Sequence, residues 1–329
     1  MLKIGVLGAG HLGKIHIKCI KNIPEFNLIG FYDINKDVAA SVAKEFDINS
    51  FEKMEDLIAN VDVVDIVTPT IKHFECASMA LKMGKHVFLE KPIVATTEEA
   101  KELTKLAADV NGKIQVGHVE RFNPAYLSVK DRIDNPMFIE AHRLSDYNPR
   151  GTDVPVILDL MIHDLDILLH IVKSPVKNIH ASGVPVVSQT ADIANTRIEF
   201  ENGAVANITA SRISMKKMRK FRIFQNNAYI TIDFLKKVSE IINVSDTPDY
   251  SDPYALIVED ANGGKSKQLI FENPPIQEIN AIATELQSFY DAIINDESPI
   301  VSMTDGINAL TVANKINDLV NQSLKNVIK

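Results

Sequence analysis

The chain has 329 residues, more than a single hydrophobic core usually serves, so two domains are expected. Apolar residues make up 46% and charged residues 24% of the sequence, with no Trp, and this composition excludes a disordered, collagen-like or disulfide-rich protein. The formal charge of -8 and the lack of a basic arm argue against nucleic acid as a partner.

The sequence favours a cytoplasmic protein without a membrane partner. The apolar run in "MLKIGVLGAG" is too short for a signal peptide, and no later run reaches the length of a bilayer span. Cys19 and Cys76 have no CxxC partner, so we expect both to be buried, reduced thiols.

Strand patterns alternate with helix patterns in the first part of the chain. Short apolar runs predict strands, and runs with helical spacing between them predict helices. The strand patterns begin at residues 3, 26, 62, 86 and 113, and the helix patterns cover 11–23, 36–46, 71–84 and 96–112. This alternation predicts a Rossmann domain over residues 1–121, with a doubly wound parallel sheet.

The motif GxGxxG, in "GAGHLG", stands between the first predicted strand and the first predicted helix. Its glycines allow a tight turn, close approach to a pyrophosphate and close packing of helix on strand. We therefore expect the dinucleotide to contact residues of this turn, namely Gly8, Gly10, His11, Leu12 and Gly13.

An acid ends the second predicted strand. Asp33 lies 20 residues after Gly13, where a carboxylate would bond the hydroxyls of an adenosine ribose. The carboxylate would repel a 2′-phosphate, and no arginine follows in "DINKD", so NAD is favoured over NADP. Lys36 nearby leaves NADP as the less favoured alternative.

The periodicity changes after about residue 137. Segments with partial alternation, joined by "ENGA" and "QNNA", predict antiparallel strands and hairpins. One helix is expected over residues 155–172, and two more close the chain. Residues 243–268 read as an exposed loop region with weak strands. We expect an α+β domain over residues 122–329, whose final helices, the last at about 304–325, could pack back on the first domain.

One helix carries a candidate acid-base pair. Asp159 and His163 are four residues apart and thus on one helical face, and Asp166 follows three residues later. A histidine can take a proton near neutral pH, and a carboxylate one turn away can orient it. The alternative is an acid-rich helix start with an ordinary half-buried imidazole. A metal site is disfavoured because no further His or Cys cluster completes a ligand shell.

Lys91 follows the predicted strand "HVFLE". Strands of an open parallel sheet bring ligands to their carboxyl ends, so this lysine should lie near a bound nicotinamide, where an ammonium can stabilise developing charge. Pro92 fixes the direction of the chain as it leaves. Taken alone, a lysine at a strand end is more often simply solvated.

These motifs together resemble one family. "GAGHLG", Thr68 with Pro69, "EKP" at Glu90 to Pro92, and the Asp159 and His163 pair are similar to the glucose-fructose oxidoreductase, inositol dehydrogenase and MocA (Gfo/Idh/MocA) family over nearly the whole chain. The resemblance implies a C-terminal domain with a large open antiparallel sheet, commonly used for contacts within a homodimer or homotetramer.

The resemblance also implies roles for individual residues. Lys91 would bond the hydroxyl being oxidised, His163 would remove its proton as general base, and Asp159 would orient or bind the substrate. Further cofactor contacts are expected from the ends of the middle strands and the helix between them, at Thr68, Pro69, His73, Glu90 and Lys91.

The segment "VGHVERFNPAY", residues 116–126, resembles bacterial members that oxidise the 3-hydroxyl of UDP-linked amino sugars, such as UDP-N-acetylglucosamine or its uronate. Arg121, Asn123 and Arg143 are therefore expected to contact the substrate and could meet its diphosphate. The basic segment 212–222 could do the same, but a solvated hairpin is the favoured interpretation.

The leading prediction is an NAD-dependent sugar dehydrogenase that acts on a UDP-linked N-acetylhexosamine. One alternative is a dehydrogenase or reductase of inositol or a free sugar, which needs no phosphate contacts. Another is a non-catalytic, NAD-sensing regulator, which the presence of both Lys91 and His163 disfavours.

Overall fold

The computed structural model describes residues 1–148, 154–259 and 264–327, which divide into two compact units. The first unit contains residues 1–122 and 279–311, and the second contains residues 123–278 and the chain from 312 onward. The chain therefore leaves the first unit after Phe122 and returns to it at Ile279. The sequence predicts that the final helices, the last of them at about 304–325, could pack back on the first domain, and the structure places residues 279–311 in the first unit.

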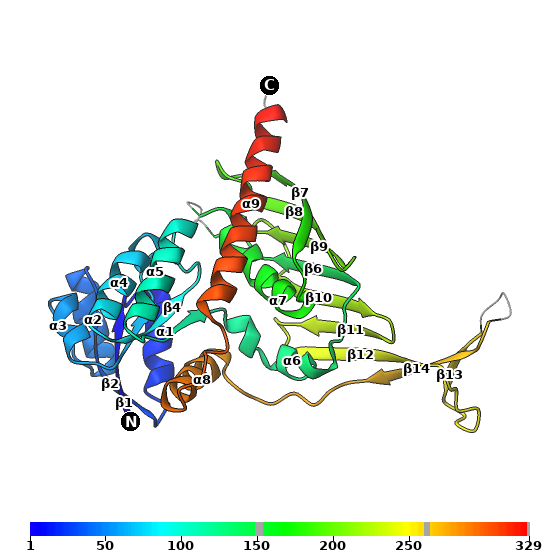
Figure 1. Cartoon of the computed structure of the whole chain (residues 1–329), viewed down its shortest axis with the longest axis horizontal. Coiled ribbons are helices and arrows are strands. Elements are labelled where there is room, and N and C mark those ends of the chain that lie inside the picture. Colours follow the sequence, from blue (N-terminus) through cyan, green and yellow to red (C-terminus); the bar gives the residue numbers. More distant parts are fainter. Residues whose placement is uncertain (149–153, 260–263, 328–329) are drawn as a thin grey trace. The chain divides into compact units, whose positions relative to one another are not determined.

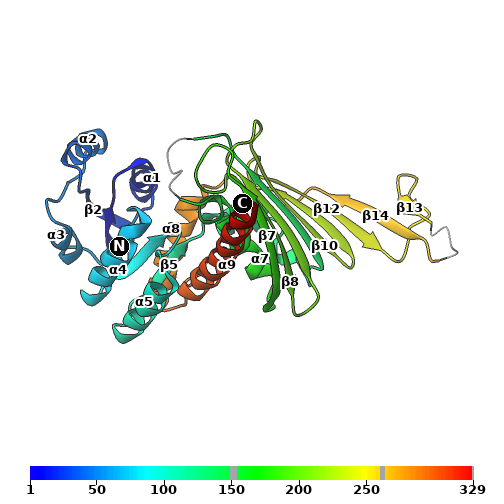
Figure 2. The ribbon, with the colours of Figure 1, turned by 90° about the horizontal axis from the view of Figure 1, so that it is seen from above.

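The first unit is built around a five-stranded parallel sheet of order β2-β1-β3-β4-β5 (Figures 1 and 2). The burial of β3 and β5 is complete along their length, as expected for strands covered on both faces. The strands are β1 (Leu2–Leu7), β2 (Phe26–Tyr32), β3 (Val63–Ile66), β4 (His86–Glu90) and β5 (Ile114–Gly117). The predicted Rossmann sheet is confirmed.

Helices cover the first sheet, and local signals fix where several of them begin. Asn35 caps one helix by accepting from the N–H groups of Asp37 and Val38, and Thr96 and Glu99 form a capping box at another. The helices are α1 (His11–Ile20), α2 (Lys36–Phe46), α3 (Met54–Ala59), η1 (Thr70–Lys72), α4 (His73–Lys82), α5 (Thr97–Asp109), η2 (Val119–Phe122) and α8 (Ala281–Ile294).

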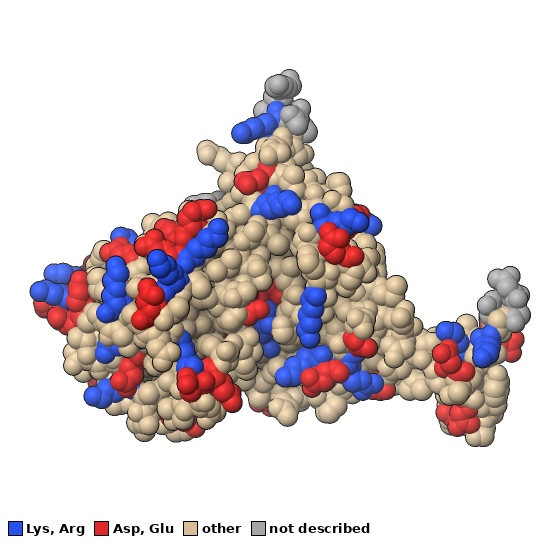
Figure 3. All heavy atoms as spheres, in the orientation of Figure 1, with Lys and Arg blue, Asp and Glu red and all other residues tan. Residues whose placement is uncertain are grey.

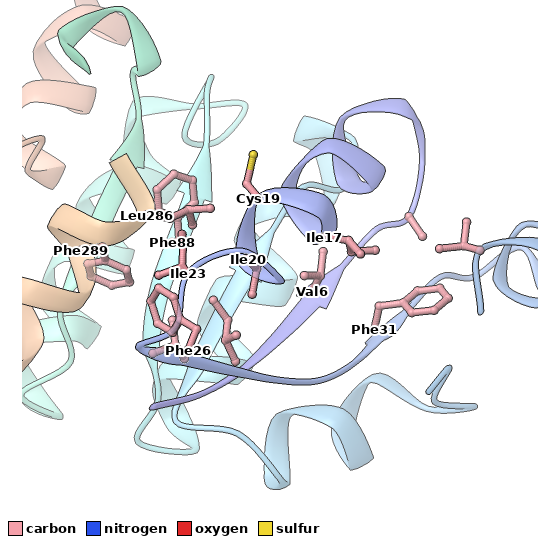
Figure 4. Packing of buried hydrophobic residues seen from close by; sticks show 14 of the residues in the cluster. Val6, Ile17, Cys19, Ile20, Ile23, Phe26, Phe31, Phe88, Leu286 and Phe289 are labelled. Atoms are coloured by element: carbon pink, nitrogen blue, oxygen red, sulfur yellow. The ribbon is translucent and has the colours of Figure 1, made fainter. Parts of the chain in front are cut away.

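Helix α8 completes the core of the first unit although it comes from far along the sequence. Figure 4 shows Leu286 and Phe289 of α8 beside Phe88 of β4 and Phe26 of β2. The rings of Phe88 and Phe289 have centroids 6.2 Å apart, and both side chains are fully buried. The apolar face of α8 is therefore part of the sheet's own core.

The described strands of the second unit form a nine-stranded sheet of order β13-β14-β12-β11-β10-β6-β9-β8-β7. Pairing is antiparallel except between β6 and β9, and the predicted hairpin turns join β8 to β9 and β10 to β11. The strands are β6 (Phe138–Leu144), β7 (Val176–Val184), β8 (Ile193–Phe200), β9 (Val205–Ser211), β10 (Met218–Gln225), β11 (Ala228–Asp233), β12 (Val238–Ser245), β13 (Leu256–Val258) and β14 (Lys267–Glu272).

Helices of the second unit pack on one face of this sheet, as the strand alternation requires (Figure 2). The helical segments are α6 (Pro124–Leu127), η3 (Lys130–Arg132), η4 (Ile157–Met161), α7 (Ile162–Val172) and α9 (Met303–Val327). Helix α9 begins in the first unit and continues into the second. The region predicted as a loop, 243–268, holds β13 and the ends of β12 and β14, and residues 260–263 lie outside the described residues.

Two smaller expectations concern membranes and thiols. Among the described residues, no helix is long and apolar enough to cross a membrane. Cys19 and Cys76 are both free and buried, and burial is the main reason that their pKa values lie above the ordinary value of a thiol.

Replacing Phe289 with alanine should lower the free energy of unfolding by about 3–5 kcal/mol, because it leaves a cavity between α8 and the sheet. Ile294→Ala, at the end of the same helix where the side chain is 55% exposed, should change the free energy by less than about 0.5 kcal/mol. Denaturant unfolding of both variants tests this. Equal effects would mean that α8 does not contribute to the core.

Candidate active site

The glycine turn after β1 has the geometry that a bound pyrophosphate requires. Gly8 has φ of +94° and donates its N–H to the carbonyl of Tyr32 over 2.8 Å. A side chain on Gly13 would collide with the carbonyl oxygen of Gly8, so α1 packs directly on the turn. A side chain on Gly10 would meet nothing within 4 Å, and this open side lies at the start of α1. The residues therefore fit a dinucleotide.

Asp33 lies directly after β2 and is fixed by the same turn. Its Oδ2 accepts from the N–H of Ala9 and its Oδ1 from that of Asn35, both over 2.8 Å. Gly10 and His11 line a cavity of about 500 Å³ beside this turn, together with α2 residues. The carboxylate is only half-buried, so it can still meet the hydroxyls of a ribose at this edge.

The ends of β3 and β4 are neighbours at the same edge of the sheet, because these strands are parallel and paired. Thr68 and Pro69 follow β3, and Lys91 follows β4 with a half-buried side chain. Residues expected to contact the cofactor therefore lie together at this edge of the sheet.

His73 has a different environment from the one expected of a cofactor contact. It is 1% exposed, with Nδ1 2.9 Å from the carbonyl oxygen of Pro92 and Nε2 2.8 Å from that of Thr68. Burial lowers its pKa, although both carbonyls oppose this shift. We propose that His73 positions the two strand-end loops, rather than contacting the cofactor itself.

Glu90, which precedes Lys91, belongs to a buried cluster of three ionisable side chains. His16 of α1 has its Nδ1 2.9 Å from Oδ2 of Asp65 in β3 and its Nε2 3.3 Å from Oε1 of Glu90. The other oxygen of Glu90 accepts from the backbone N–H of Lys91 over 3.1 Å. The sequence predicts that Glu90 contacts the cofactor and does not single out His16 or Asp65. A lone acid inside the apolar strand "VVDI" was the available signal, because buried acids are rarely unpaired.

The three residues expected to bind a diphosphate are buried and interact with other groups of the protein. Arg143 is 2% exposed and makes two 2.9 Å hydrogen bonds to the carboxylate of Asp164 in α7. Arg121 is buried and lies 3.5 Å from Asp305. Asn123 is buried, donates to the carbonyl of Phe234 and caps α6. We therefore revise the expectation: we propose structural roles for these three residues.

A cavity of about 470 Å³ in the second unit brings Asp159 together with cationic side chains. Asp159 lies in the π-helical turn η4, a type of turn that is frequent at functional sites. Lys217 and Arg219 line the same cavity and belong to the basic segment 212–222. From the sequence, a solvated hairpin is the favoured interpretation of this segment. Arg212 also lines it, but this side chain is buried and paired with Asp192 over 2.9 Å.

Strand geometry explains why only part of the basic segment reaches the cavity. In β10, Arg219 has the same parity as the buried Phe221 and Ile223, whereas Arg222 has the opposite parity and pairs with Glu140 over 2.7 Å. Acidic and basic side chains are interspersed on the face drawn in Figure 3. The local charge at the cavity therefore depends on the few residues that line it.

His163 stands at the start of α7, directly after the π-helical turn, and is half-buried. Asp166, the third member of the alternative metal site, is 1% exposed. Within the described residues, the side chains of His, Cys, Asp and Glu form no group of three that could hold a metal ion. Asp159 and His163 lie in the second unit and Lys91 in the first.

Both parts of the chain match known family models. Residues 2–118 match the oxidoreductase family with an NAD-binding Rossmann fold, and residues 129–231 match the GFO/IDH/MocA C-terminal domain. The UDP-N-acetylglucosamine 3-dehydrogenase of Acidithiobacillus ferrooxidans is 38% identical over 241 residues, which are 73% of this chain and 76% of that protein. The scyllo-inositol 2-dehydrogenase (NAD(+)) of Bacillus subtilis is 31% identical over 234 residues, 65% of this chain and 68% of that protein.

Solved structures agree with these matches. A structure of the Acidithiobacillus ferrooxidans enzyme has a TM-score of 0.87 at 32% identity and covers 97% of both chains. A scyllo-inositol dehydrogenase from Lactobacillus casei, solved with NAD(H) and scyllo-inositol, has a TM-score of 0.78 at 22% identity and covers 98% of both chains. The second likeness concerns the fold alone.

Asp33→Asn keeps the shape of the side chain but removes its charge, so it should reduce the preference for NAD over NADP about tenfold, or ~1.4 kcal/mol. The preference is the ratio of the two dissociation constants measured by titration calorimetry. Glu52→Gln, an exposed acid in the same unit, is the control and should leave the ratio unchanged. An unchanged ratio for Asp33→Asn would remove this carboxylate from the ribose site.

Proposed function

The chain belongs to the Gfo/Idh/MocA family of NAD-binding oxidoreductases, and from this premise we propose that it oxidises the 3-hydroxyl of a UDP-linked N-acetylhexosamine. The observation that carries the proposal is the cavity of the second unit, where Asp159 shares the lining with Lys217 and Arg219. A free polyol has no charge for these cations to meet, whereas a diphosphate has two. The Acidithiobacillus ferrooxidans relative, a UDP-N-acetylglucosamine 3-dehydrogenase, supports the same choice.

The proposed chemistry assigns one task to each candidate residue. Bound NAD supplies the acceptor for the hydride that leaves the substrate carbon. The ammonium of Lys91 bonds the reacting oxygen and stabilises the charge that develops on it. His163 takes the proton of the hydroxyl, and Asp159 orients the sugar or the imidazole.

The cations of the cavity are proposed to bind the phosphates of the substrate. Lys217 lies 3.1 Å from Asp146 but keeps 61% of its side chain exposed, so this ion pair is weak and can exchange for a phosphate. Arg219 is exposed and stands beside Arg143 in the strand register, where the charge of Arg143 is already balanced by Asp164. A diphosphate at this position would meet two exposed cations of the cavity lining.

We also propose that copies of the chain associate through the nine-stranded sheet and that the enzyme works in the cytoplasm. Large apolar side chains of this sheet remain exposed in the single chain, among them Phe224 at 38% and Phe271 at 62%. Covering such residues against a second copy would remove apolar surface from water. The two free thiols fit a reducing compartment.

Protein loaded with NAD should reduce the nicotinamide in a single turnover when UDP-N-acetylglucosamine or its uronate is added, but not with myo-inositol or free N-acetylglucosamine. Absorbance of the reduced nicotinamide measures this. Lys91→Ala should bind NAD normally and lose turnover about 100-fold or more, because a donor to the developing charge is removed. Reduction by the polyol alone would contradict the nucleotide-sugar assignment and leave the oxidoreductase assignment intact.

Replacing Arg219 or Lys217 with alanine should weaken the binding of UDP about 10-fold to 100-fold, because each change removes a charged hydrogen bond of ~1.5–3 kcal/mol. Uridine, which lacks the phosphates, should bind these variants as it binds the wild type. Arg222→Ala and Lys216→Ala are matched controls from the same segment, since neither side chain lines the cavity. Calorimetric titrations with UDP and uridine measure both effects, and normal UDP binding by Arg219→Ala would refute the phosphate site.

A further inference from the structure

We propose that His16 is a positioning residue for catalysis: it bridges Asp65 and Glu90 as a buried imidazolium and thereby fixes the backbone of Lys91. The inference rests on the proposed role of Lys91, and it adds a residue that touches neither substrate nor cofactor. Three independent parts of the first unit contribute to the bridge, which are helix α1, strand β3 and the end of strand β4.

The sheet register places both carboxylates on the face that α1 covers. Asp65 is paired with Phe88 in the neighbouring strand, so the two side chains point the same way, and Glu90 lies two residues beyond Phe88. The ring of His16 packs edge-on against Phe88, with centroids 5.8 Å apart. From this position its two nitrogens face the two carboxylates, at 2.9 Å from Asp65 and 3.3 Å from Glu90.

Charge balance favours a protonated imidazole, although burial raises the pKa of Asp65 against the effect of His16. His16 and Asp65 are both 0% exposed, and Glu90 is 7% exposed, so two carboxylates without a cation between them would be costly. Burial alone would lower the pKa of His16, but the charges of Asp65 and Glu90 and the hydrogen bond with Asp65 outweigh it and raise this pKa well above its ordinary value. The same cation helps to lower the pKa of Glu90 against the opposing effect of burial.

The groups around the bridge act on its charges in different ways. Lys91 is a second cation beside Glu90 and stabilises the ionised form of that carboxylate, while its charge opposes that of the imidazolium. Cys19 on α1, whose pKa is raised by burial, stays a neutral thiol. Helix α8, which packs against α1, brings the apolar Leu286 and Phe289 to the same core and also carries the buried Glu285.

The bridge reaches Lys91 through the carboxylate of Glu90. Oε1 of Glu90 forms an ion pair with His16 over 3.3 Å, and Oε2 accepts a hydrogen bond from the backbone N–H of Lys91, so the two oxygens of one carboxylate face the imidazolium and this N–H. Opposite Glu90 in β5 stands Gly117, where an added Cβ would lie 2.8 Å from Oε1 of Glu90. The carboxylate therefore has little space to rotate, and the direction in which the chain enters Lys91 is fixed with it.

A purely structural role for His16 makes different predictions from a positioning role. Loss of a structural contact lowers stability, but the folded enzyme would keep its rate constant. Loss of positioning lowers the rate constant of the folded enzyme, because a displacement of about 1 Å can cost on the order of 100-fold in rate. The charge state of His16 can also be observed directly, without any activity.

The first test is a titration of His16 in the wild-type protein, followed by NMR of the labelled imidazole and assigned with the His16→Gln variant. We expect an imidazolium signal that persists through neutral pH and titrates only on the alkaline side, since the folded-state pKa is raised. A neutral His16 at pH 7 would overturn the proposal. This result does not depend on the substrate.

The second test compares His16→Gln with His86→Gln, a half-buried histidine at the opposite end of β4. His16→Gln should bind NAD within about threefold of wild type and lose on the order of 100-fold in the single-turnover rate of folded enzyme, with a small change in KM. We expect the wild-type rate to decline as pH rises through the pKa of His16, and this decline should be absent from His16→Gln. The control should keep its rate, and an unchanged rate in His16→Gln would reject positioning.

Asp65→Asn replaces His16→Gln in this test if His16→Gln does not fold, because the asparagine keeps a hydrogen-bond acceptor and removes one charge. It should return the pKa of His16 toward its ordinary value and slow hydride transfer in the same direction. Failure of the proposed function has a different signature. If Lys91→Ala retains full turnover, Lys91 is not catalytic, whereas the imidazolium of His16 would still be seen in the titration.

Discussion

The parallel pairing of β1, β3 and β4 is the constraint on which the cofactor half of the site depends. Parallel strands end at one edge of the sheet, so the glycine turn, the Thr68 loop and Lys91 are neighbours although about 80 residues separate the first from the last. The same pairing leaves the inner strands buried on both faces. Any charged side chain that such a strand carries, like Asp65, must then find its partner inside the protein.

Buried charges in both units follow this rule, and their pairing decides which residues can serve a ligand. Arg143 with Asp164, Arg212 with Asp192 and His16 with Asp65 are each held at 2.9 Å in buried positions. Replacing one partner would leave an uncompensated charge, so these groups have little freedom to change partners. The cations at an exposed cavity wall, Lys217 and Arg219, are better suited to bind an incoming phosphate.

Most of the fold could be predicted from the sequence, because its signals are local. GxGxxG at a strand end, continuous apolar strands and the capping residue Thr96 each indicate their own element, and the parallel and antiparallel halves differ in periodicity. The residues expected to contact the cofactor, among them Gly8, Gly13 and Asp33, follow from position within one strand-turn-helix-strand unit. The return of residues 279–311 to the first unit has no such signal, because an amphipathic helix does not specify the surface that it covers.

The part of the site that the sequence did not predict depends on pairing between distant residues. From the sequence, Arg143 is a candidate ligand for phosphate. In the structure its partner is Asp164, which lies 21 residues further along the chain. Arg219 and Arg222 are equivalent in the sequence, yet a shift of one residue in the register of β10 would exchange their faces and remove the cation from the cavity. His16 is part of an ordinary helix pattern, and only the register of β3 against β4 brings two carboxylates to its ring. Side-chain chemistry at this site is therefore set by strand register.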